Sequence, residues 1–236
     1  MRIFITGIAG FIGMHVAQRL VSDGHTVTGI DNFSDYYDPK LKHARIEQLD
    51  PSCRVQRLDV SDAAAVNSAV TAFAPDVVVH LAAQAGVRHS LVDPMAYVQS
   101  NVAGHLAVLE ACRALGDRLS HLVYASSSSI YGGREKTPFS ESDTADAPVS
   151  LYAATKRADE LMSSAYAHLF GIKQIGLRFF TVYGPWGRPD MAYWSFTDKI
   201  FRGEPIWLFN NGDMRRDFTW IGDIVSGVVA TVTRDP

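Results

Sequence analysis

The chain has 236 residues, 47% of them hydrophobic and 20% charged, with a formal net charge of −3 at pH 7. A chain of this length can bury a large core, and the absence of a basic excess argues against a nucleic-acid partner. No run is long enough to span a membrane, and Cys53 and Cys112 form neither a disulfide framework nor a metal-ligand spacing. These features predict a cytoplasmic globular protein without a metal site.

Predicted strands and helices alternate along the chain. The expected strands are Arg2–Thr6, His25–Asp31, Arg54–Asp59, Asp76–Ala82, Leu119–Ser126 and Lys173–Phe179. The expected helices are 11–22, 38–49, 62–73, 94–115 and 150–169. This alternation predicts the α/β fold with a doubly wound parallel sheet (Rossmann), in which ligands bind beyond the carboxyl ends of the strands. A helix over 192–201 is expected after it.

The first strand leads into the run Gly7-Ile8-Ala9-Gly10-Phe11-Ile12-Gly13. Glycines at this spacing permit a tight turn, bring the backbone close to a pyrophosphate and direct the next helix N-terminus toward it. The second strand ends in Asp31, whose carboxylate can bind an adenosine ribose and repel a 2′-phosphate, which favours NAD over NADP. The alternative is an ordinary strand–turn–helix with glycines for packing. The predicted cofactor-binding residues here are Gly7, Gly10, Phe11, Ile12, Gly13, Asp31 and Asn32.

Tyr152 and Lys156 are four residues apart on a predicted helix, a spacing that places both side chains on one face. A nearby ammonium favours the phenolate form of a tyrosine. Such a tyrosine can act as general base and general acid in a reversible alcohol oxidation. The alternative is a buried ring beside a solvated amine.

Several motifs together resemble the extended short-chain dehydrogenase/reductase superfamily and, within it, the nucleotide-sugar epimerases. The motifs are the glycine run, Asp59-Val60, His80 to Gln84, Asn101 to Gly104, Ser126 to Gly132, Tyr152 to Lys156 and Leu177 to Phe180. The resemblance implies an NAD-dependent enzyme in which Lys156 binds the nicotinamide ribose and polarises Tyr152, and Ser127 is the catalytic hydroxyl. It also implies cofactor contacts from Asp59, Val60, Leu81, Ala82, Ala83 and Asn101.

Simpler interpretations exist for three of these features. Asp59 can instead cap the helix over 62–73, although Ser61 or Asp62 would serve as well. Asn101 can be a solvated side chain on its helix, because only the resemblance assigns it to the cofactor. The serine run Ser126 to Ser129 can be a polar turn at a strand end.

The serine run also separates reactions that begin with oxidation at C4 of a sugar. Relatives that dehydrate the sugar carry an acid pair beside the catalytic hydroxyl, whereas this chain has Ser128 and Ser129. Relatives that decarboxylate a nucleotide uronate typically carry a glutamate there, and none lies between Ser126 and Gly132. The segment therefore favours epimerisation.

Three segments look like the UDP-glucuronate 4-epimerases: 31–37, 84–90 and 178–191, with His89 as a minor departure from the usual tyrosine. A uronate carboxylate is best held by hydroxyl donors and an arginine, for which Ser127, Ser128, Thr181 and Arg188 are candidates, with Arg88 as a second cation. Isolated loop arginines are more often solvated surface residues. Residues 213–220 resemble the family's phosphate-binding strand, which implies a strand there. Arg216 is the predicted diphosphate clamp, assisted by Lys199, while Arg215 should point away on that strand.

The sequence thus predicts C4 epimerisation of UDP-glucuronate to UDP-galacturonate. An epimerase for neutral UDP-hexoses and a non-catalytic dinucleotide-binding scaffold remain as alternatives. Residues 1–180 are expected to form the NAD-binding domain, and 181–236 a partial nucleotide-sugar-binding region, because family members continue beyond this point. By resemblance, the helices around 94–114 and 150–169 are expected to form a homodimer interface.

Overall fold

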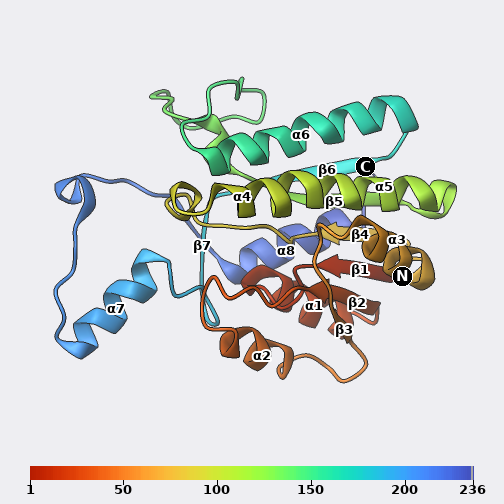
Figure 1. Ribbon diagram of the computed structural model, residues 1–236, viewed down its shortest axis with the longest axis horizontal. Helices are drawn as coiled ribbons and strands as arrows, with labels where there is room; N and C mark the ends of the chain where they lie inside the picture. The colour runs from red at the N-terminus through yellow and green to blue at the C-terminus, as the bar shows by residue number, and fades with distance from the viewer. Residues whose placement is uncertain (235) are drawn as a thin grey trace.

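The computed structural model describes residues 1–234 and 236, and its centre is a parallel sheet of six strands (Figure 1). The strand order is β3-β2-β1-β4-β5-β6, the doubly wound arrangement predicted from the sequence. The direction of winding reverses between β1 and β4, which places the expected ligand crevice at their carboxyl ends. The strands are β1 (Arg2–Thr6), β2 (Thr26–Asp31), β3 (Arg54–Arg57), β4 (Val77–His80), β5 (His121–Ser127) and β6 (Gln174–Phe179).

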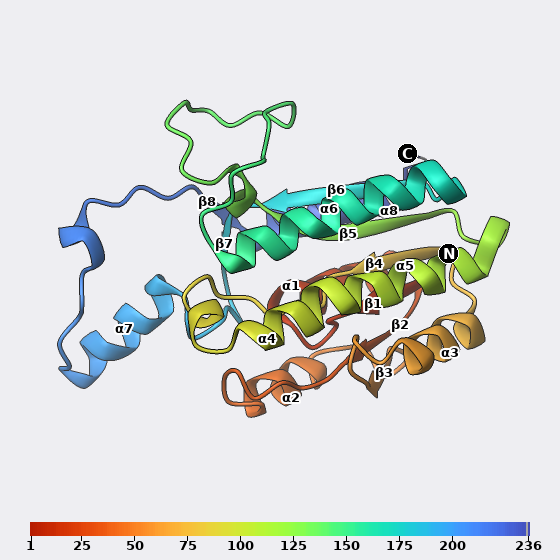
Figure 2. The ribbon, with the colours of Figure 1, turned by 45° about the horizontal axis from the view of Figure 1, so that its top comes forward.

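Helices cover both faces of this sheet, as Figures 1 and 2 show. One layer contains α1 (Phe11–Ser22), α2 (Lys40–Ile46) and α8 (Ile221–Val232). The other contains α3 (Ala63–Phe73), α4 (Pro94–Tyr97), α5 (Gly104–Leu115) and α6 (Leu151–Phe170). Alternate residues of β1 serve the two layers, since Ile3 and Ile5 join the core under α1 and α8 while Phe4 joins the core under α3 and α5. Helix α8 was not predicted from the sequence.

The predicted helix over 94–115 is interrupted by a π-helical segment, Val98–Ala103, between α4 and α5. A widened turn of this kind accommodates one extra residue and is often found at functional sites. Asn101 lies in this segment and is buried, with 1% of its surface exposed. The predicted strand over 213–220 is also wrong in extent, because only β8 (Phe218–Trp220) forms, paired in parallel with β7 (Thr181–Tyr183) as a separate small sheet.

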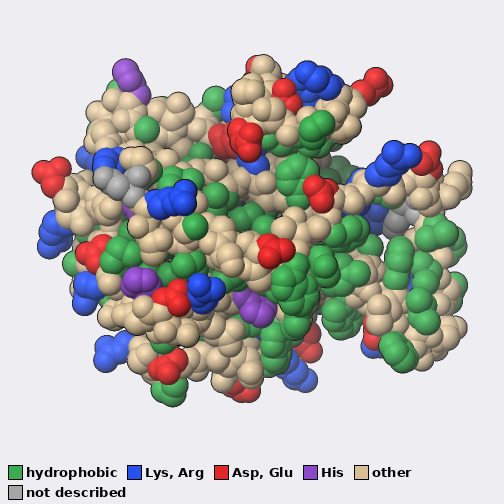
Figure 3. Space-filling view, turned by 180° about the vertical axis from the view of Figure 1, so that it is seen from behind, with side chains coloured by type: hydrophobic (Ala, Val, Ile, Leu, Met, Phe, Trp, Pro, Cys, Tyr) green, Lys and Arg blue, Asp and Glu red, His purple; other side chains and the backbone are tan. Residues whose placement is uncertain are grey.

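Helix α7 (Ala192–Arg202) and the segment that follows it project away from the sheet and its two helix layers in both ribbon views (Figures 1 and 2). Figure 3 shows hydrophobic side chains gathered on this projecting part of the molecule. Ile200, Phe201, Trp207 and Leu208 are among its exposed apolar residues. Among residues 1–234 and 236, the structure contains no helix that could cross a membrane.

Candidate active site

A cleft of about 1350 Å³ lies at the carboxyl ends of the central strands and continues toward α7. It brings together almost all of the residues that the sequence predicted for cofactor, catalysis and substrate. Asp59 and Asn101 are the two predicted residues outside its lining. The predicted residues that line it are Gly7, Gly10, Phe11, Ile12, Gly13, Asp31, Asn32, Val60, Leu81, Ala82, Ala83, Arg88, Ser127, Ser128, Tyr152, Lys156, Thr181, Arg188, Lys199 and Arg216.

The turn between β1 and α1 depends on its glycines. Gly7 has φ +72°, and a Cβ there would lie 2.7 Å from the backbone nitrogen of Ala82. A Cβ on Gly13 would lie 2.2 Å from the carbonyl oxygen of Gly7, so the first turn of α1 packs directly onto the end of β1. Gly10 caps α1 without a side-chain hydrogen bond. The helix N-terminus therefore keeps backbone N–H groups for a ligand, which fits the pyrophosphate of a dinucleotide.

Asp31 ends β2 and is 5% exposed. It accepts hydrogen bonds from the backbone nitrogens of Ala9 (3.2 Å) and Phe33 (2.8 Å) and forms an ion pair of 2.8 Å with the ammonium of Lys42. A carboxylate has about four lone-pair sites, so one remains for a ribose hydroxyl. The Lys42 charge partly offsets the repulsion that Asp31 was predicted to exert on a 2′-phosphate. Sequence reasoning missed Lys42, which stands in a polar helix without any motif.

Asp59 does not cap the following helix, so that alternative is wrong. The N-cap of α3 is Asp62, whose side chain accepts a hydrogen bond from the backbone nitrogen of Ala65. Asp59 instead accepts from the side chain of Asn32 (2.9 Å) and from the backbone nitrogen of Ser61 (2.9 Å). It thereby connects the loops that follow β2 and β3.

Asn101 is not a solvated helix residue, so that alternative is wrong as well. Its side chain accepts a hydrogen bond from the backbone nitrogen of Gln84 (2.8 Å) and donates to the Gln84 carbonyl (3.2 Å) and to the Thr155 hydroxyl (2.9 Å). These bonds fix the loop after β4 against the helix that carries Tyr152. Asn101 therefore acts behind the cleft surface, through the residues that line it.

All four serines of the run line the cleft, and Ser126 also bonds a side chain of α6. The Ser126 hydroxyl donates to Glu160 (2.6 Å), which also receives two bonds from Arg178, of 2.9 and 3.0 Å. Ser127, 6% exposed, accepts a hydrogen bond from the backbone nitrogen of Ser129 and lines the cleft. The polar-turn alternative thus describes part of this segment, because a short 3-10 helix (Ser128–Tyr131) does begin here.

Tyr152 lies in the first turn of α6, which Ser150 caps by accepting a hydrogen bond from the backbone nitrogen of Ala153. Its ring packs edge-on against Tyr97, with ring centroids 6.2 Å apart. Lys156 is 2% exposed, and its ammonium bonds Asp159 at 2.8 Å. Burial lowers the pKa of Lys156, but the charges of Asp159 and Tyr152 outweigh burial, and the pKa is raised overall.

Arg188 is not an isolated surface arginine. Its Nε and Nη2 atoms donate to the two carboxylate oxygens of Asp190, at 3.1 and 3.0 Å. The hydroxyl of Tyr36 also donates to Asp190 (3.2 Å), and all three residues line the cleft. Burial and the Asp190 charge raise the pKa of Tyr36 to about 12. The ion pair with Asp190 uses one edge of the Arg188 guanidinium and leaves Nη1 for a second acceptor.

Arg45, on α2, positions the loop that carries Arg188. It is fully buried and donates to the carbonyl oxygens of Trp186 (2.7 Å) and Ala9 (3.2 Å) and to the Tyr37 hydroxyl (2.6 Å). Sequence reasoning missed this residue too. The only local signal was its three-residue spacing from Lys42, which puts both side chains on one helix face.

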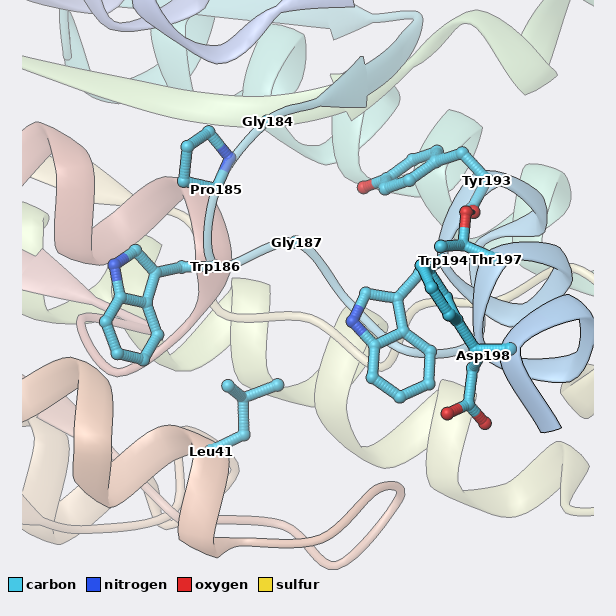
Figure 4. Close-up of a pocket in the computed structure, with 10 residues that line it drawn as sticks. Leu41, Gly184, Pro185, Trp186, Gly187, Tyr193, Trp194, Thr197 and Asp198 are labelled. Atoms are coloured by element: carbon cyan, nitrogen blue, oxygen red, sulfur yellow. Dashed lines mark hydrogen bonds between the residues drawn. The ribbon is translucent and has the colours of Figure 1, made fainter.

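Arg215 and Arg216 both precede β8 and are exposed, so the strand predicted to orient them does not extend to them. Arg215 is not among the residues that line the cleft, which agrees with the prediction that it points away. Arg216 nevertheless lines the cleft, as Lys199 of α7 does. A second cavity of about 600 Å³ lies between α2 and α7, and Figure 4 shows Trp186, Trp194 and Leu41 around it. Helix α7 therefore turns one face to each cavity.

The sequence and the fold match known proteins over nearly the whole chain. Residues 3–236 match the model of the NAD dependent epimerase/dehydratase family. The chain is 50% identical to a probable UDP-glucuronate 4-epimerase of Rhizobium meliloti over 97% of its own length and 67% of the relative's. It is 50% identical to UDP-glucuronate 4-epimerase 1 of Arabidopsis thaliana over 98% of its own length, and it spans 54% of that relative.

A solved structure agrees with these sequences. The UDP-glucuronic acid 4-epimerase of Bacillus cereus, in complex with UDP-glucuronic acid and NAD, superposes with a TM-score of 0.91 at 35% identity. The match covers 100% of this chain and 74% of the Bacillus protein. The chain therefore belongs to the NAD dependent epimerase/dehydratase family and resembles its UDP-glucuronate 4-epimerases along nearly its whole length.

Proposed function

We propose that this protein converts UDP-glucuronate to UDP-galacturonate by NAD-dependent epimerisation at C4. The observation that carries the proposal is the single cleft that joins the glycine turn, the set Ser127, Tyr152 and Lys156, and the cationic residue Arg188. A dinucleotide-binding scaffold has no chemical need for that hydroxyl, phenol and ammonium set. The names of the relatives give the same activity.

We assign NAD binding to residues 1–180 and part of the UDP-sugar binding to 181–236. The glycine turn and the N-terminus of α1 would hold the pyrophosphate, Asp31 would hold the adenosine ribose, and Lys156 would hold the nicotinamide ribose. When bound, NAD supplies the reversible acceptance of a hydride from the sugar. Arg216 and Lys199, which line the cleft near α7, bind the diphosphate of the sugar nucleotide.

The catalytic residues act on the hydroxyl at C4. The Tyr152 phenolate removes its proton, the Lys156 ammonium stabilises that phenolate, and Ser127 donates a hydrogen bond to the oxygen that becomes a carbonyl. The 4-keto sugar then rotates in the cleft, so that the opposite face of C4 would meet the cofactor, and Tyr152 returns the proton to the C4 oxygen. The reaction inverts the configuration at C4 and leaves the sugar at its original oxidation state.

The carboxylate of the uronate is held by Ser128, Thr181 and the open edge of Arg188, while the single O–H of Ser127 is engaged at the C4 oxygen. A 4-keto uronate is a β-keto acid, and it loses CO₂ when the bond between C5 and the carboxylate carbon overlaps with the C4 carbonyl. Contacts that hold the carboxylate in the ring plane, where that overlap is poor, therefore also protect the intermediate. We predict that Thr181→Ala raises the fraction of decarboxylated product, measured by NMR at equal conversion. An unchanged fraction would show that Thr181 does not restrain the carboxylate.

The test of the function is incubation of the protein with UDP-glucuronate, with and without added NAD⁺, followed by NMR of the anomeric protons. UDP-glucose is run in parallel. Formation of UDP-galacturonate supports the proposal. Conversion of UDP-glucose alone would replace it with neutral-hexose epimerisation, and NAD⁺ binding without conversion of either sugar would indicate a binding role.

We also propose a homodimer that pairs the outer faces of α5 and α6, and a cytoplasmic location. Leu106 on α5 and Leu161 and Leu169 on α6 are exposed apolar side chains on these helices. Two-fold pairing would remove them from water. Light scattering coupled to size exclusion measures the mass, and a monomer at micromolar concentration would overturn the dimer.

A further inference from the structure

We infer that Asp159 is a positioning residue for the reaction: its buried carboxylate fixes the Lys156 ammonium beside Tyr152 and keeps that ammonium charged at alkaline pH. The inference rests on the proposed roles of Tyr152 and Lys156. The pattern of a tyrosine and a lysine four residues apart requires no acid at this position. The ion pair between Asp159 and Lys156 is a feature of the folded chain.

The geometry of the pair is direct. Lys156 Nζ and Asp159 Oδ2 are 2.8 Å apart, and the two side chains are 2% and 0% exposed. Residues three apart on a helix meet on one face, so α6 brings the carboxylate to the ammonium without any change in the backbone. At this depth an unpaired ammonium is strongly disfavoured, and a bonded carboxylate is its natural counter-charge.

Other groups around the pair do not replace this carboxylate. The titratable side chains that face it are His80 on β4, His105 on α5, Tyr124 on β5, and Tyr152 and Glu160 on α6. Burial, together with the nearby Lys156 charge, lowers the pKa of both histidines, so they stay neutral.

Glu160, four residues after Lys156, is already engaged by other partners. Its carboxylate bonds the guanidinium groups of Arg157 and Arg178 and the hydroxyl of Ser126. Asp159 is therefore the carboxylate that bonds Lys156 directly, and its second oxygen, Oδ1, has no other hydrogen-bond partner within the described chain. The short distance and the burial of both side chains therefore make the Asp159 carboxylate the counter-ion of the Lys156 ammonium.

Removal of the carboxylate has a predictable consequence. Burial alone lowers the pKa of Lys156, and the opposing charge of Asp159 is the largest contribution that raises it. Without that charge, Lys156 loses its proton at a lower pH, and the phenolate of Tyr152 loses the cation that stabilises it. Burial raises the pKa of Asp159 to about 6, so the carboxylate is ionised at alkaline pH, where it is needed.

The first test compares Asp159→Asn with a matched control, Glu110→Gln. Glu110 and Arg113 also form an ion pair three residues apart on a helix, but their side chains are 40% and 49% exposed. The rate is measured from pH 6 to pH 11 with UDP-glucuronate. We expect the alkaline limb of kcat in Asp159→Asn to move to lower pH by about 1–3 pH units, the size of a nearby-charge effect, and Glu110→Gln to follow the wild type. An unmoved limb would overturn the inference.

The second test does not depend on activity. The midpoint of urea unfolding is measured between pH 8 and pH 10.5 for both variants and the wild type. With the Lys156 pKa lowered in the folded state, the unfolded chain binds more protons in this window, so the midpoint of Asp159→Asn rises with pH relative to Glu110→Gln. The double variant Lys156→Met/Asp159→Asn should lack that relative rise. A difference that does not change with pH would refute the inference.

A third measurement uses the unaltered protein, should Asp159→Asn not fold. The ¹⁵Nζ resonance of Lys156, assigned by its loss in Lys156→Met, should keep the chemical shift of a charged ammonium at pH 10. A neutral-amine shift would overturn the inference. If the protein turns over neither sugar, the urea series and this resonance still decide the role of Asp159. If it turns over UDP-glucuronate with an unmoved alkaline limb, the proposed function stands and the inference falls.

Discussion

Replacement of Gly13 by alanine tests how closely α1 packs onto the turn after β1. The new Cβ would lie 2.2 Å from the Gly7 carbonyl oxygen and 2.9 Å from the Gly7 carbonyl carbon, so backbone atoms and not a flexible side chain must move. Overpacking of this kind costs about 3 kcal/mol at its upper end, and alanine regains about 1 kcal/mol of helix propensity. The net loss is about 2 kcal/mol, which lowers Tm by about 4–8 °C in a chain of this size.

Gly227→Ala is the matched control, because Gly227 also lies within a helix, α8, but a Cβ there meets no atom within 4 Å. This variant should gain about 1 kcal/mol from helix propensity. Thermal unfolding followed by circular dichroism measures both, and calorimetric titration measures NAD⁺ affinity, which should fall at least about tenfold in Gly13→Ala alone. A Gly13→Ala protein as stable as Gly227→Ala would refute the tight contact and the role given to the glycine turn.

Three further predictions address substrate, stability and cofactor. Arg188→Lys keeps the charge but loses the guanidinium fork, so kcat/KM for UDP-glucuronate should fall about 100-fold while any turnover of UDP-glucose changes little; equal losses would contradict a carboxylate contact. Burial raises the pKa of Glu160, but its hydrogen bonds from Arg178 and Ser126 outweigh burial, so its pKa is lowered overall. The ion pair of Glu160 with Arg178 therefore stabilises the fold above pH 4.5, and this stabilisation is lost as pH falls. Glu160→Gln should therefore lose about 3 kcal/mol in urea unfolding at pH 7 and less at pH 3, and a pH-independent loss would refute this. Asp31→Asn leaves the Lys42 ammonium without its carboxylate, so NADP⁺ binding should improve about tenfold relative to NAD⁺ by calorimetry; an unchanged ratio would contradict the charge argument.

The sequence was informative where a function depends on local pattern. Gly7, Gly10 and Gly13 form one turn, and Tyr152 and Lys156 lie on one helix, so their spacing along the chain already determines their spacing in space. The alternation of strands and helices likewise sufficed to predict a doubly wound parallel sheet, because parallel strands joined by right-handed crossovers permit few arrangements. The ends of the elements were less predictable, since hydrogen bonds of individual side chains decide them.

Residues that act through contacts from distant parts of the chain could not be found in this way. Lys42 meets Asp31 because α2 folds back over the end of β2, and Tyr36 meets Asp190 across 154 positions of sequence. Asp159 was closer to detection, because it is three residues from Lys156 on the same helix, but an acid beside a lysine usually indicates a solvated surface pair. Only the burial of both side chains distinguishes this pair from an ordinary one.

The cofactor half and the substrate half of the cleft are joined by one buried guanidinium. Arg45 bonds the carbonyl of Ala9 in the glycine turn and the carbonyl of Trp186 in the loop that leads to Arg188. Trp186 has φ +65°, a conformation that costs a non-glycine residue about 1–3 kcal/mol and persists only where its surroundings impose it. The two bonds from Arg45 to that carbonyl provide the constraint. The position of Arg188, proposed to bind the uronate carboxylate, is therefore set from the same glycine turn that is proposed to bind NAD. This shared support explains how the sugar and the cofactor can be aligned as closely as hydride transfer between them requires.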